Sequence, residues 1–275
     1  MRIQAAVRYV EERIGRPISI DEVARYVELS PFHFHRLFSA EVGEPFYGYI
    51  KRVRMTGAAA RLKWTTDSLF EIATAFGYAS NAAFSHAFSA YFGMPPRRFR
   101  DDDEIWPNRV SGYEVDKAIT VRMIVGYHCL ARRYYGHYSR VPAHWRDFID
   151  RLPAQFSPTS PNIHLLGLVY DDPRITPADQ IRYDCCIMFN DPAEPPALQA
   201  TDSLLPIQTR PGRYALLEHE GPPISRGISY SLILDEWLPR TRYVMTDDPA
   251  IEIFSSAPIG PASDHLKFQI LMPLE

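Results

Sequence analysis

Apolar residues recur every three to four positions along the first hundred residues, a spacing that predicts amphipathic helices. The first predicted helix covers residues 3–14 and is ended by Gly15 and Pro17. Ser19 and Glu22 have the S-x-x-E spacing of a capping box, which predicts the start of a short second helix. Two helices separated by a turn are therefore expected here.

A third helix is predicted to begin at Ser30, a favourable N-cap residue, because Pro31 suits the first helical turn. Gly43 is expected to end it. A longer helix over about residues 46–62 follows.

The helical pattern then repeats. Ser68 and Glu71 form a second S-x-x-E box, and residues 34–45 align with residues 84–95 at an offset of 50. The positions that coincide are Phe38/Phe88, Ser39/Ser89, Ala40/Ala90, Gly43/Gly93 and Pro45/Pro95. Each copy predicts a capped helix, a turn and a second helix with one apolar side, which is the outline of a helix-turn-helix.

The charge differs between the two parts of the 275-residue chain. Residues 1–100 carry 14 lysines and arginines against 9 aspartates and glutamates, a net charge of +5, whereas the remainder carries 16 against 24, a net charge of −8. A basic first part favours a polyanionic partner. The acidic run of residues 101–104 marks the change of sign, so we place an interdomain linker over 101–117.

Two interpretations of the repeated helices follow from the residues alone. An ordinary helical bundle would show the same apolar stripes. DNA binding is favoured because the outer stripe of the third helix, Phe32, His35, Arg36 and Ser39, has no acidic member. Basic residues also follow each helix pair, where phosphates would be met: Lys51, Arg52, Arg54, Arg97, Arg98 and Arg100.

A family resemblance supports the DNA interpretation. It is carried by Ile18-Ser-Ile-Asp-Glu-Val-Ala24, Ser30-Pro-Phe-His-Phe-His-Arg-Leu-Phe38, Gly43, Ile72-Ala-Thr-Ala-Phe-Gly-Tyr78, Phe84, Phe88 and Phe92-Gly-Met-Pro-Pro-Arg-Arg-Phe-Arg100. With this spacing, residues 18–100 resemble the DNA-binding domain of the AraC/XylS family of bacterial transcription regulators. The resemblance implies seven helices, with two recognition helices that enter successive major grooves of double-stranded promoter DNA, about 10 bp apart.

The resemblance also implies roles for individual residues. Phe32, His35 and Arg36, with Ser39, would face the first groove, where arginine can pair with guanine and Phe32 can touch a thymine methyl group. The matching positions of the second recognition helix are Ala82, Ser85, His86 and Ser89, with Asn81 beside them. Arg52 and Arg97 would meet phosphates. The position of His86 is commonly arginine in the family, and its neighbours are small. We therefore expect the second groove to be read less discriminatingly.

Residues 118–275 have shorter apolar runs that predict an α+β domain. Strands are expected over 119–125, 165–170, 181–189, 213–219, 251–255 and 265–273, and helices over 140–152 and 225–237. This order predicts two β-α-β-β units side by side, with the helices on one face of the sheets. The expected organisation of the chain is a helix-turn-helix domain over 1–100, a linker over 101–117 and an α+β domain over 118–275.

The second part also resembles a known family. The residues that carry the resemblance are Gly136-His-Tyr138, Trp145, Arg182-Tyr-Asp184, Pro211-Gly-Arg-Tyr214, Gly221-Pro222, Trp237-Leu-Pro239 and Asp248-Pro-Ala-Ile-Glu-Ile-Phe254. They resemble the GyrI-like small-molecule-binding domain, with looser motifs than those of the first part. A helix-turn-helix domain before such a domain is similar to the Rob-type arrangement.

Glu252 is the main candidate for an effector site. Alternation along its strand puts Ile251 and Ile253 on one sheet face and Glu252 with Phe254 on the other. If the isoleucines pack on the helices, Glu252 points into the groove between the two units, where a lipophilic cation would complement it. In drug sensors of the GyrI-like family a glutamate at this motif position has that role. The alternative is a solvated strand edge.

Aromatic residues are the expected neighbours of Glu252 in such a site. The candidates are Tyr183, Tyr214, Phe254, Tyr138, Trp145 and Phe268, although the helical spacing of Trp145 favours a core role.

Other functions remain open or are excluded by what the sequence lacks. Some GyrI-like proteins are hydrolases that use a glutamate and a tyrosine, and the domain could instead bind a partner protein such as RNA polymerase. No P-loop, GxSxG or GxGxxG motif is present, and the cysteines and histidines lack metal spacing, so we expect neither enzyme activity nor a cofactor or metal.

The expected location and assembly follow from similar arguments. No apolar run approaches the ~20 residues that span a bilayer, and the first residues do not resemble a signal peptide. These features predict a cytoplasmic regulator without a membrane partner. Two recognition helices in one chain make a monomer sufficient for specific binding.

Overall fold

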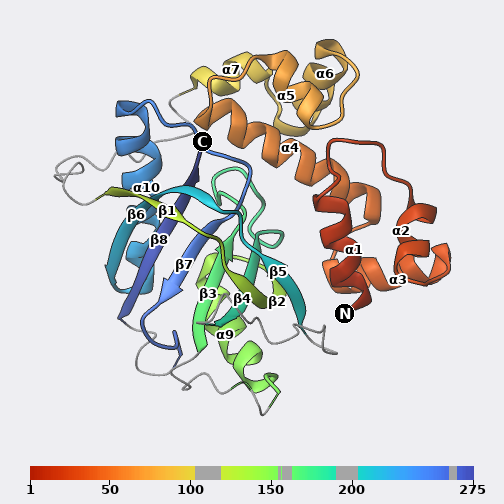
Figure 1. The fold of residues 1–275 in the computed structure, drawn as a ribbon. Helices are drawn as coiled ribbons and strands as arrows, with labels where there is room; N and C mark the ends of the chain where they lie inside the picture. Colours follow the sequence, from red (N-terminus) through yellow and green to blue (C-terminus); the bar gives the residue numbers. More distant parts are fainter. Residues whose placement is uncertain (103–118, 154–155, 157–162, 190–203, 260–264) are drawn as a thin grey trace. The chain divides into compact units, whose positions relative to one another are not determined.

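The computed structural model describes residues 1–102, 119–153, 156, 163–189, 204–259 and 265–275 (Figure 1). The chain divides into two compact units, one containing the helices up to residue 102 and the other containing the sheet. The expected linker lies outside the described residues from position 103 onward.

The described residues 1–102 of the first unit form seven helices, as the AraC/XylS resemblance implies. They are α1 (Arg2–Glu11), α2 (Ile20–Tyr26), α3 (Pro31–Val42), α4 (Phe46–Trp64), α5 (Leu69–Ala75), α6 (Asn81–Phe92) and α7 (Pro96–Asp101). The predicted repeat corresponds to the pairs α2–α3 and α5–α6, with the long helix α4 between them. Gly43 and Gly93 end α3 and α6 in the left-handed conformation, with φ of +85° and +74°.

The two predicted capping boxes differ in the structure. Ser68 accepts a hydrogen bond from the backbone N–H of Glu71, whose carboxylate accepts one from the N–H of Ser68, so this box is complete. Ser19 also caps its helix, but the Glu22 carboxylate instead accepts hydrogen bonds from Tyr9 and Arg16. The second half of the Ser19 box is therefore replaced by a contact between α1 and α2.

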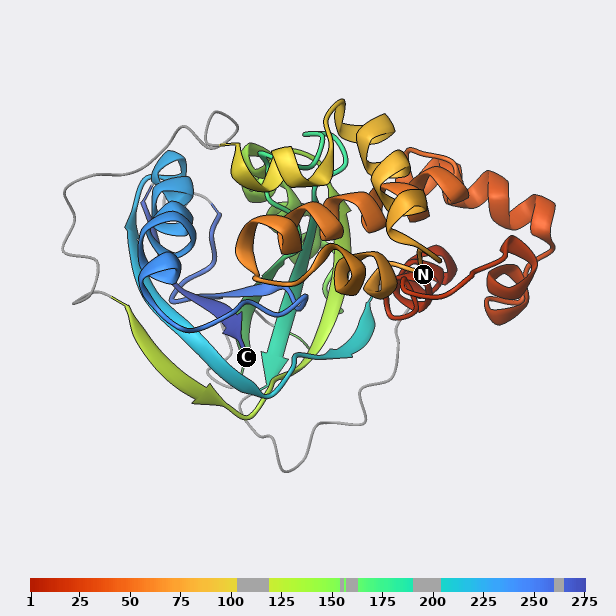
Figure 2. The ribbon, with the colours of Figure 1, turned by 90° about the horizontal axis from the view of Figure 1, so that it is seen from above.

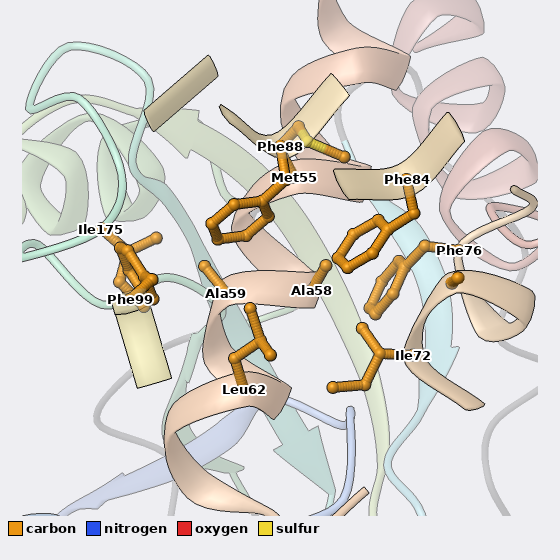
Figure 3. Packing of buried hydrophobic residues seen from close by; sticks show 11 residues of the cluster. Met55, Ala58, Ala59, Leu62, Ile72, Phe76, Phe84, Phe88, Phe99 and Ile175 are labelled. Carbon is orange, nitrogen blue, oxygen red and sulfur yellow. The ribbon is translucent and has the colours of Figure 1, made fainter. Parts of the chain in front are cut away.

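The core around the second helix pair is built on one side of α4 (Figure 3). Its members from the helical unit are Met55, Ala58, Ala59, Leu62, Ile72, Ala73, Phe76, Phe84, Phe88 and Phe99. A Cβ atom at Gly57 would come within 2.5 Å of the Phe76 ring, so α4 can pack this closely only because that position is glycine.

The described part of the second unit contains one eight-stranded sheet with the order β1-β6-β8-β7-β3-β4-β2-β5, in which all pairs of neighbouring strands are antiparallel. The strands are β1 (Thr120–Ile124), β2 (His128–Tyr135), β3 (Ile163–Val169), β4 (Arg182–Phe189), β5 (Leu205–Gln208), β6 (Gly212–Gly221), β7 (Ala250–Phe254) and β8 (Leu266–Leu274). Figure 2 shows the curvature of this sheet.

The strand order differs from the expected one in a specific way. β1, predicted to open the first unit, pairs with β6 of the second half, whereas β5 pairs with β2 of the first half. Neither β2 nor β5 was predicted. The two adjacent arginines of β2 hide its strand pattern, and Pro206 lies in β5, where an edge position tolerates proline.

The helical segments of this unit are less regular than predicted. Helix α9 (Val141–Asp150) follows the 3-10 turn η1 (Tyr138–Arg140) and agrees with the expected helix over 140–152. The helix expected over 225–237 is instead a succession of short pieces. These are the 3-10 turn η2 (Pro223–Ser225), α10 (Arg226–Ser231), the π-helical segment η3 (Leu232–Trp237) and the 3-10 turn η4 (Leu238–Arg240).

Both helices lie on the sheet face that carries Glu252. Trp145 of α9 donates to Tyr183, and Arg226 of α10 contacts Glu252. The opposite face carries Ile251 with Ile253, in a cluster made of residues from strands and their adjoining turns. The predicted alternation of β7 is therefore correct. The isoleucines do not pack on the helices, which was the condition for Glu252 to point into the groove.

The complete capping box gives a stability prediction. We expect Ser68→Ala to lower the free energy of unfolding of the helical unit by about 1 kcal/mol, because α5 loses its N-cap acceptor. Thr66→Ala, at an exposed position two residues earlier, should change it by less than about 0.5 kcal/mol. Denaturant unfolding followed by the helical circular dichroism signal measures both, and equal midpoints would contradict the role of the cap.

Candidate functional site

The outer side of α3 is exposed as the sequence predicted. Phe32 has 83% of its surface exposed, and His35 and Arg36 are exposed beside it, whereas Ser39 is partly buried. Phe34 lies fully buried on the inner side of the same helix. An exposed phenylalanine next to an exposed guanidinium, which contacts only His33 Nδ1 at 3.4 Å among the described residues, gives this surface both an apolar and a hydrogen-bonding group, which suits contact with base edges.

The corresponding surface of α6 carries shorter side chains. Asn81, Ala82 and His86 are exposed, and Ser85 is partly buried. This surface offers His86 where α3 has Arg36, so its reach and hydrogen-bonding capacity are smaller.

The basic residues after the helix pairs divide into two groups. Lys51, Arg97 and Arg98 are exposed. Arg54 donates to the backbone carbonyls of residues 14 and 16, and Arg100 to those of residues 62 and 67. Arg54 therefore links α4 to the segment that follows α1, and Arg100 links α7 to the C-terminal end of α4 and the segment after it.

Arg52 corrects the sequence analysis. Its side chain is 2% exposed and its Nη2 lies 2.7 Å from the Glu44 carboxylate. The guanidinium also lies 5.0 Å from the centre of the Tyr49 ring. A group buried and neutralised in this way cannot meet a phosphate, so the prediction for Arg52 is wrong, while Arg97 remains accessible.

In the second unit, Glu252 lies in β7 near the middle of the sheet and is fully buried. Its Oε2 accepts hydrogen bonds from Arg226 Nη2 at 2.5 Å and from Tyr183 Oη at 3.0 Å, and its Oε1 accepts one from Tyr230 Oη at 3.0 Å. Burial raises the pKa of Tyr183 well above its ordinary value, so the phenol stays neutral and donates. The carboxylate is thus held by three donors away from water.

Arg226 is the first residue of α10, and its charge balances that of Glu252. Its guanidinium carbon lies 5.3 Å from the centre of the Phe268 ring and 5.7 Å from that of the Tyr183 ring. Burial acts to lower the pKa of Arg226, but the Glu252 carboxylate together with the surrounding tyrosines outweighs it, so that the pKa is raised. The site therefore already contains an ionised organic cation in contact with aromatic rings.

The structure brings three more of the predicted aromatic residues to this face. Trp145 donates from Nε1 to Tyr183 Oη at 3.2 Å, and its ring packs against Phe254 at 5.4 Å between centroids. Tyr138 stands edge-on to Tyr183 at 6.4 Å and donates its hydroxyl to the carbonyl of Asp171. Trp145 is fully buried, as its predicted core role required.

Tyr214 does not belong to the site. It lies on the opposite sheet face, in the cluster that contains Ile251 and Leu271, and its hydroxyl donates to the carbonyl of Arg210 at 2.8 Å. The prediction of Tyr214 as a ligand contact is therefore wrong.

Phe268 was among the aromatic candidates, but three other residues around Glu252 were missed: Arg226, Tyr230 and Gly167. The spacing of Arg226 and Tyr230, four apart on a helix, is the signal for a shared face. Gly167 interrupts an apolar strand, which often marks a close approach. A Cβ atom there would lie 2.0 Å from Tyr183 Oη and 3.2 Å from Glu252 Oε2, so only glycine leaves room for this hydrogen bond.

Neither a metal site nor a membrane-spanning helix is found in the described part of the chain. No group of three histidine, cysteine, aspartate or glutamate side chains is placed to hold a metal ion there. No described helix combines the length and apolar character needed to cross a bilayer.

Family comparison assigns both units. Residues 23–102 match the model of a helix-turn-helix domain, and residues 118–275, more than half of the chain, match that of the GyrI-like small molecule binding domain. The chain belongs to the AraC-type regulators with a GyrI-like domain. Both resemblances noted in the sequence are thereby confirmed.

Curated relatives match about a third of this AraC-type protein. The uncharacterized regulator YbfP of Bacillus subtilis is 33% identical over 98 residues, which are 36% of this chain and 33% of YbfP. The multiple antibiotic resistance protein MarA of Escherichia coli is 28% identical over 98 residues, 36% of this chain and 77% of MarA. GbdR of Pseudomonas aeruginosa is 34% identical over 96 residues, 35% of this chain and 26% of GbdR. This chain thus spans about a third of YbfP and a quarter of GbdR.

Solved structures match fractions of this chain. A regulator with an AraC-type DNA-binding domain from Chromobacterium violaceum is 30% identical, covering 39% of this chain and 95% of that one, with a TM-score of 0.36. The C-terminal domain of EcmrR is 15% identical, covering 57% of this chain and 96% of that one, with a TM-score of 0.44.

The close approach at Gly167 gives a prediction for the GyrI-like domain. We expect Gly167→Ala to lower its free energy of unfolding by about 1–3 kcal/mol, because the new methyl group overlaps Tyr183. Gly227→Ala is the matched control, since a Cβ atom there meets nothing within 4 Å. Thermal unfolding compares the two variants, and a Gly167→Ala protein as stable as Gly227→Ala would refute the packing described.

Proposed function

We propose that this AraC-type protein reads two successive major grooves of promoter DNA with α3 and α6, and that its GyrI-like domain senses a small lipophilic cation at Glu252. The proposed division of the chain is DNA binding over 1–100, a linker over 101–117 and effector binding over 118–275. The observation that carries the effector class is a buried carboxylate among aromatic rings, with a guanidinium as its counter-charge.

The DNA-reading proposal is supported by the exposed residues of both recognition helices. Arg36 has the reach to pair with guanine O6 and N7, and Phe32 to contact a thymine methyl group. Arg97 is exposed and placed in sequence where a phosphate contact is expected. Because His86 and its small neighbours offer less hydrogen bonding, the first groove would contribute more specificity than the second.

The effector proposal is supported by electrostatics. An isolated ionised carboxylate is costly to bury, so a site that buries one must supply a cation. Aromatic faces add further attraction for a cation, which strengthens as water is excluded. An organic cation with apolar substituents therefore fits both the charge of Glu252 and the rings of Tyr183 and Phe268.

Binding explains this geometry better than hydrolysis does. Glu252 and Tyr183 are the residue types of a base and a proton donor and lie 3.0 Å apart. However, both carboxylate oxygens already accept hydrogen bonds from neighbouring side chains, so Glu252 can take a proton from water only by giving up one of these contacts. Burial raises the pKa of Glu252, although the charge of Arg226 favours the ionised form. The remaining alternative, a ligand-free module that binds RNA polymerase or another protein, is decided by the ligand experiment below.

The DNA proposal predicts unequal effects in the two recognition helices. Arg36→Ala should weaken binding by about 1–3 kcal/mol and relax one base position. His86→Ala should cost less, because a histidine forms fewer base contacts than a bidentate arginine. Fluorescence anisotropy at fixed salt, on a duplex selected by the wild-type protein from a random-sequence pool, measures both. Equal losses would remove the asymmetry.

The effector proposal predicts charge-selective stabilisation of the full-length protein. Methyltriphenylphosphonium should raise the unfolding temperature, because a ligand at ~100 times its Kd contributes about 2.7 kcal/mol. Triphenylphosphine oxide is the neutral control and should have little effect, and Glu252→Gln should abolish the cation response. No response to the cation in the wild-type protein would favour the partner-binding alternative.

A further inference from the structure

We infer that Arg226 is an internal occupant of the cation site at Glu252, and that an organic cation from outside binds by displacing Arg226 together with helix α10. The inference rests on the proposed function for the class of effector. It adds that Arg226 competes with the effector for Glu252, and that loss of the Arg226–Glu252 contact would free helix α10 to move.

The surroundings of Arg226 contain the groups that would recognise an external cation. Its guanidinium hydrogen-bonds Glu252 and lies over the rings of Tyr183 and Phe268. A carboxylate combined with two aromatic faces is a general recognition arrangement for guanidinium and quaternary cations. Arg226 therefore fills the position that the proposed effector needs.

Simultaneous occupation by both cations is unfavourable. Glu252 supplies one negative charge, and its two oxygens already accept from Arg226, Tyr183 and Tyr230. A second cation would place two positive charges against one carboxylate in a buried site, where repulsion is screened little. Exchange of one cation for the other keeps the charge balanced, so displacement is the favoured mode of binding.

Arg226 forms fewer hydrogen bonds with its carboxylate than Arg182, another buried arginine in the same unit, forms with Asp171. Arg182 forms a two-point interaction with Asp171, with Nε to Oδ2 and Nη2 to Oδ1 both at 2.8 Å. Arg226 reaches Glu252 through Nη2 alone, and its buried Nε has no hydrogen-bond partner among the described residues. Two-point pairs are the stronger ones, and an unmade buried hydrogen bond is costly, so release of Arg226 is comparatively easy.

The segment that carries Arg226 is suited to movement. Helix α10 has only six residues and lies between a 3-10 turn and a π-helical segment, both of which have poorer hydrogen-bond geometry than an α-helix. Tyr230 of the same helix also donates to Glu252. One carboxylate therefore holds both ends of this short helix, and its capture by another cation would release both contacts.

The first experiment is chemical rescue in the full-length protein. Arg226→Ala removes the internal cation, and millimolar N-ethylguanidinium should raise its unfolding temperature, whereas neutral N-ethylurea should not. The rise should be absent in the wild-type protein, where the site is filled, and in Arg226→Ala/Glu252→Gln, where the carboxylate is gone. Equal effects of the two compounds on Arg226→Ala would overturn the inference.

The second experiment measures competition and does not depend on the alanine variant folding. Arg226→Gln keeps most of the side-chain volume without its charge, and should bind methyltriphenylphosphonium at least about tenfold more tightly than the wild-type protein in isothermal titration calorimetry, a difference of about 1.4 kcal/mol. Arg240→Gln, at an exposed arginine paired with Glu236 in the same helical segment, should bind like the wild type. Equal affinity of Arg226→Gln and wild type would identify the Arg226–Glu252 pair as purely structural.

These outcomes separate the inference from the proposed function. Rescue of Arg226→Ala by N-ethylguanidinium, with no phosphonium binding to any variant, would support the internal cation and reject the lipophilic effector class. Phosphonium binding to the wild-type protein, unchanged by Arg226→Gln and without chemical rescue, would support the effector class and reject displacement of Arg226.

Discussion

A negative charge in the middle of an eight-stranded sheet is the constraint on which the GyrI-like domain depends. Glu252 has no access to water, so its neighbours must supply every hydrogen bond and the balancing charge. Tyr183 comes from β4 and Arg226 with Tyr230 from α10, and Gly167 lacks a side chain so that these groups can converge. The buried Glu252 carboxylate therefore depends on the pairing of the strands, on the position of α10 and on the absence of a side chain at Gly167.

The helix-turn-helix domain solves a different problem, which is to expose two surfaces from a small core. Its repeated helices bury phenylalanines on one side and leave the recognition residues outside. The arginines of this domain fall into two groups, those that form internal contacts and those that are exposed. Arg52, Arg54 and Arg100 join parts of the domain to one another, whereas Arg36 and Arg97 remain accessible. The basic composition of residues 1–100 thus contributes to folding as well as to charge.

The sequence predicted the helical domain well because its signals are local. Ser30, Ser68 and Gly43 act within one turn of their helices, and the repeat doubles each signal. The sheet was less predictable, since strand order depends on pairings between distant residues. Thus β1 was assigned to the wrong half, and β2 and β5 were overlooked.

The proposed effector site shows the same division between local and distant information. The alternation of β7 placed Glu252 and Phe254 on one face correctly, but only the packing of α9 and α10 shows which face that is. The Arg226–Glu252 contact joins residues 26 positions apart, and Arg52 appeared exposed because its partner Glu44 lies two turns away. A buried ion pair cannot be predicted from the pattern of apolar and polar positions, because charged residues read as exposed in that pattern.

The exchange of edge strands between the two halves of the sheet has a consequence for how the domain folds. Thr120 of β1 pairs with Leu216 of β6, nearly a hundred residues later, and His128 of β2 pairs with Gln208 of β5. Neither half of the sheet can form completely by itself, because β1 of the first half pairs with β6 of the second and β5 of the second half pairs with β2 of the first. Pairings of such high contact order slow folding and make the transition cooperative across the whole sheet. The domain should consequently fold and unfold as a single unit, and a protease should degrade it as a whole and leave no stable half.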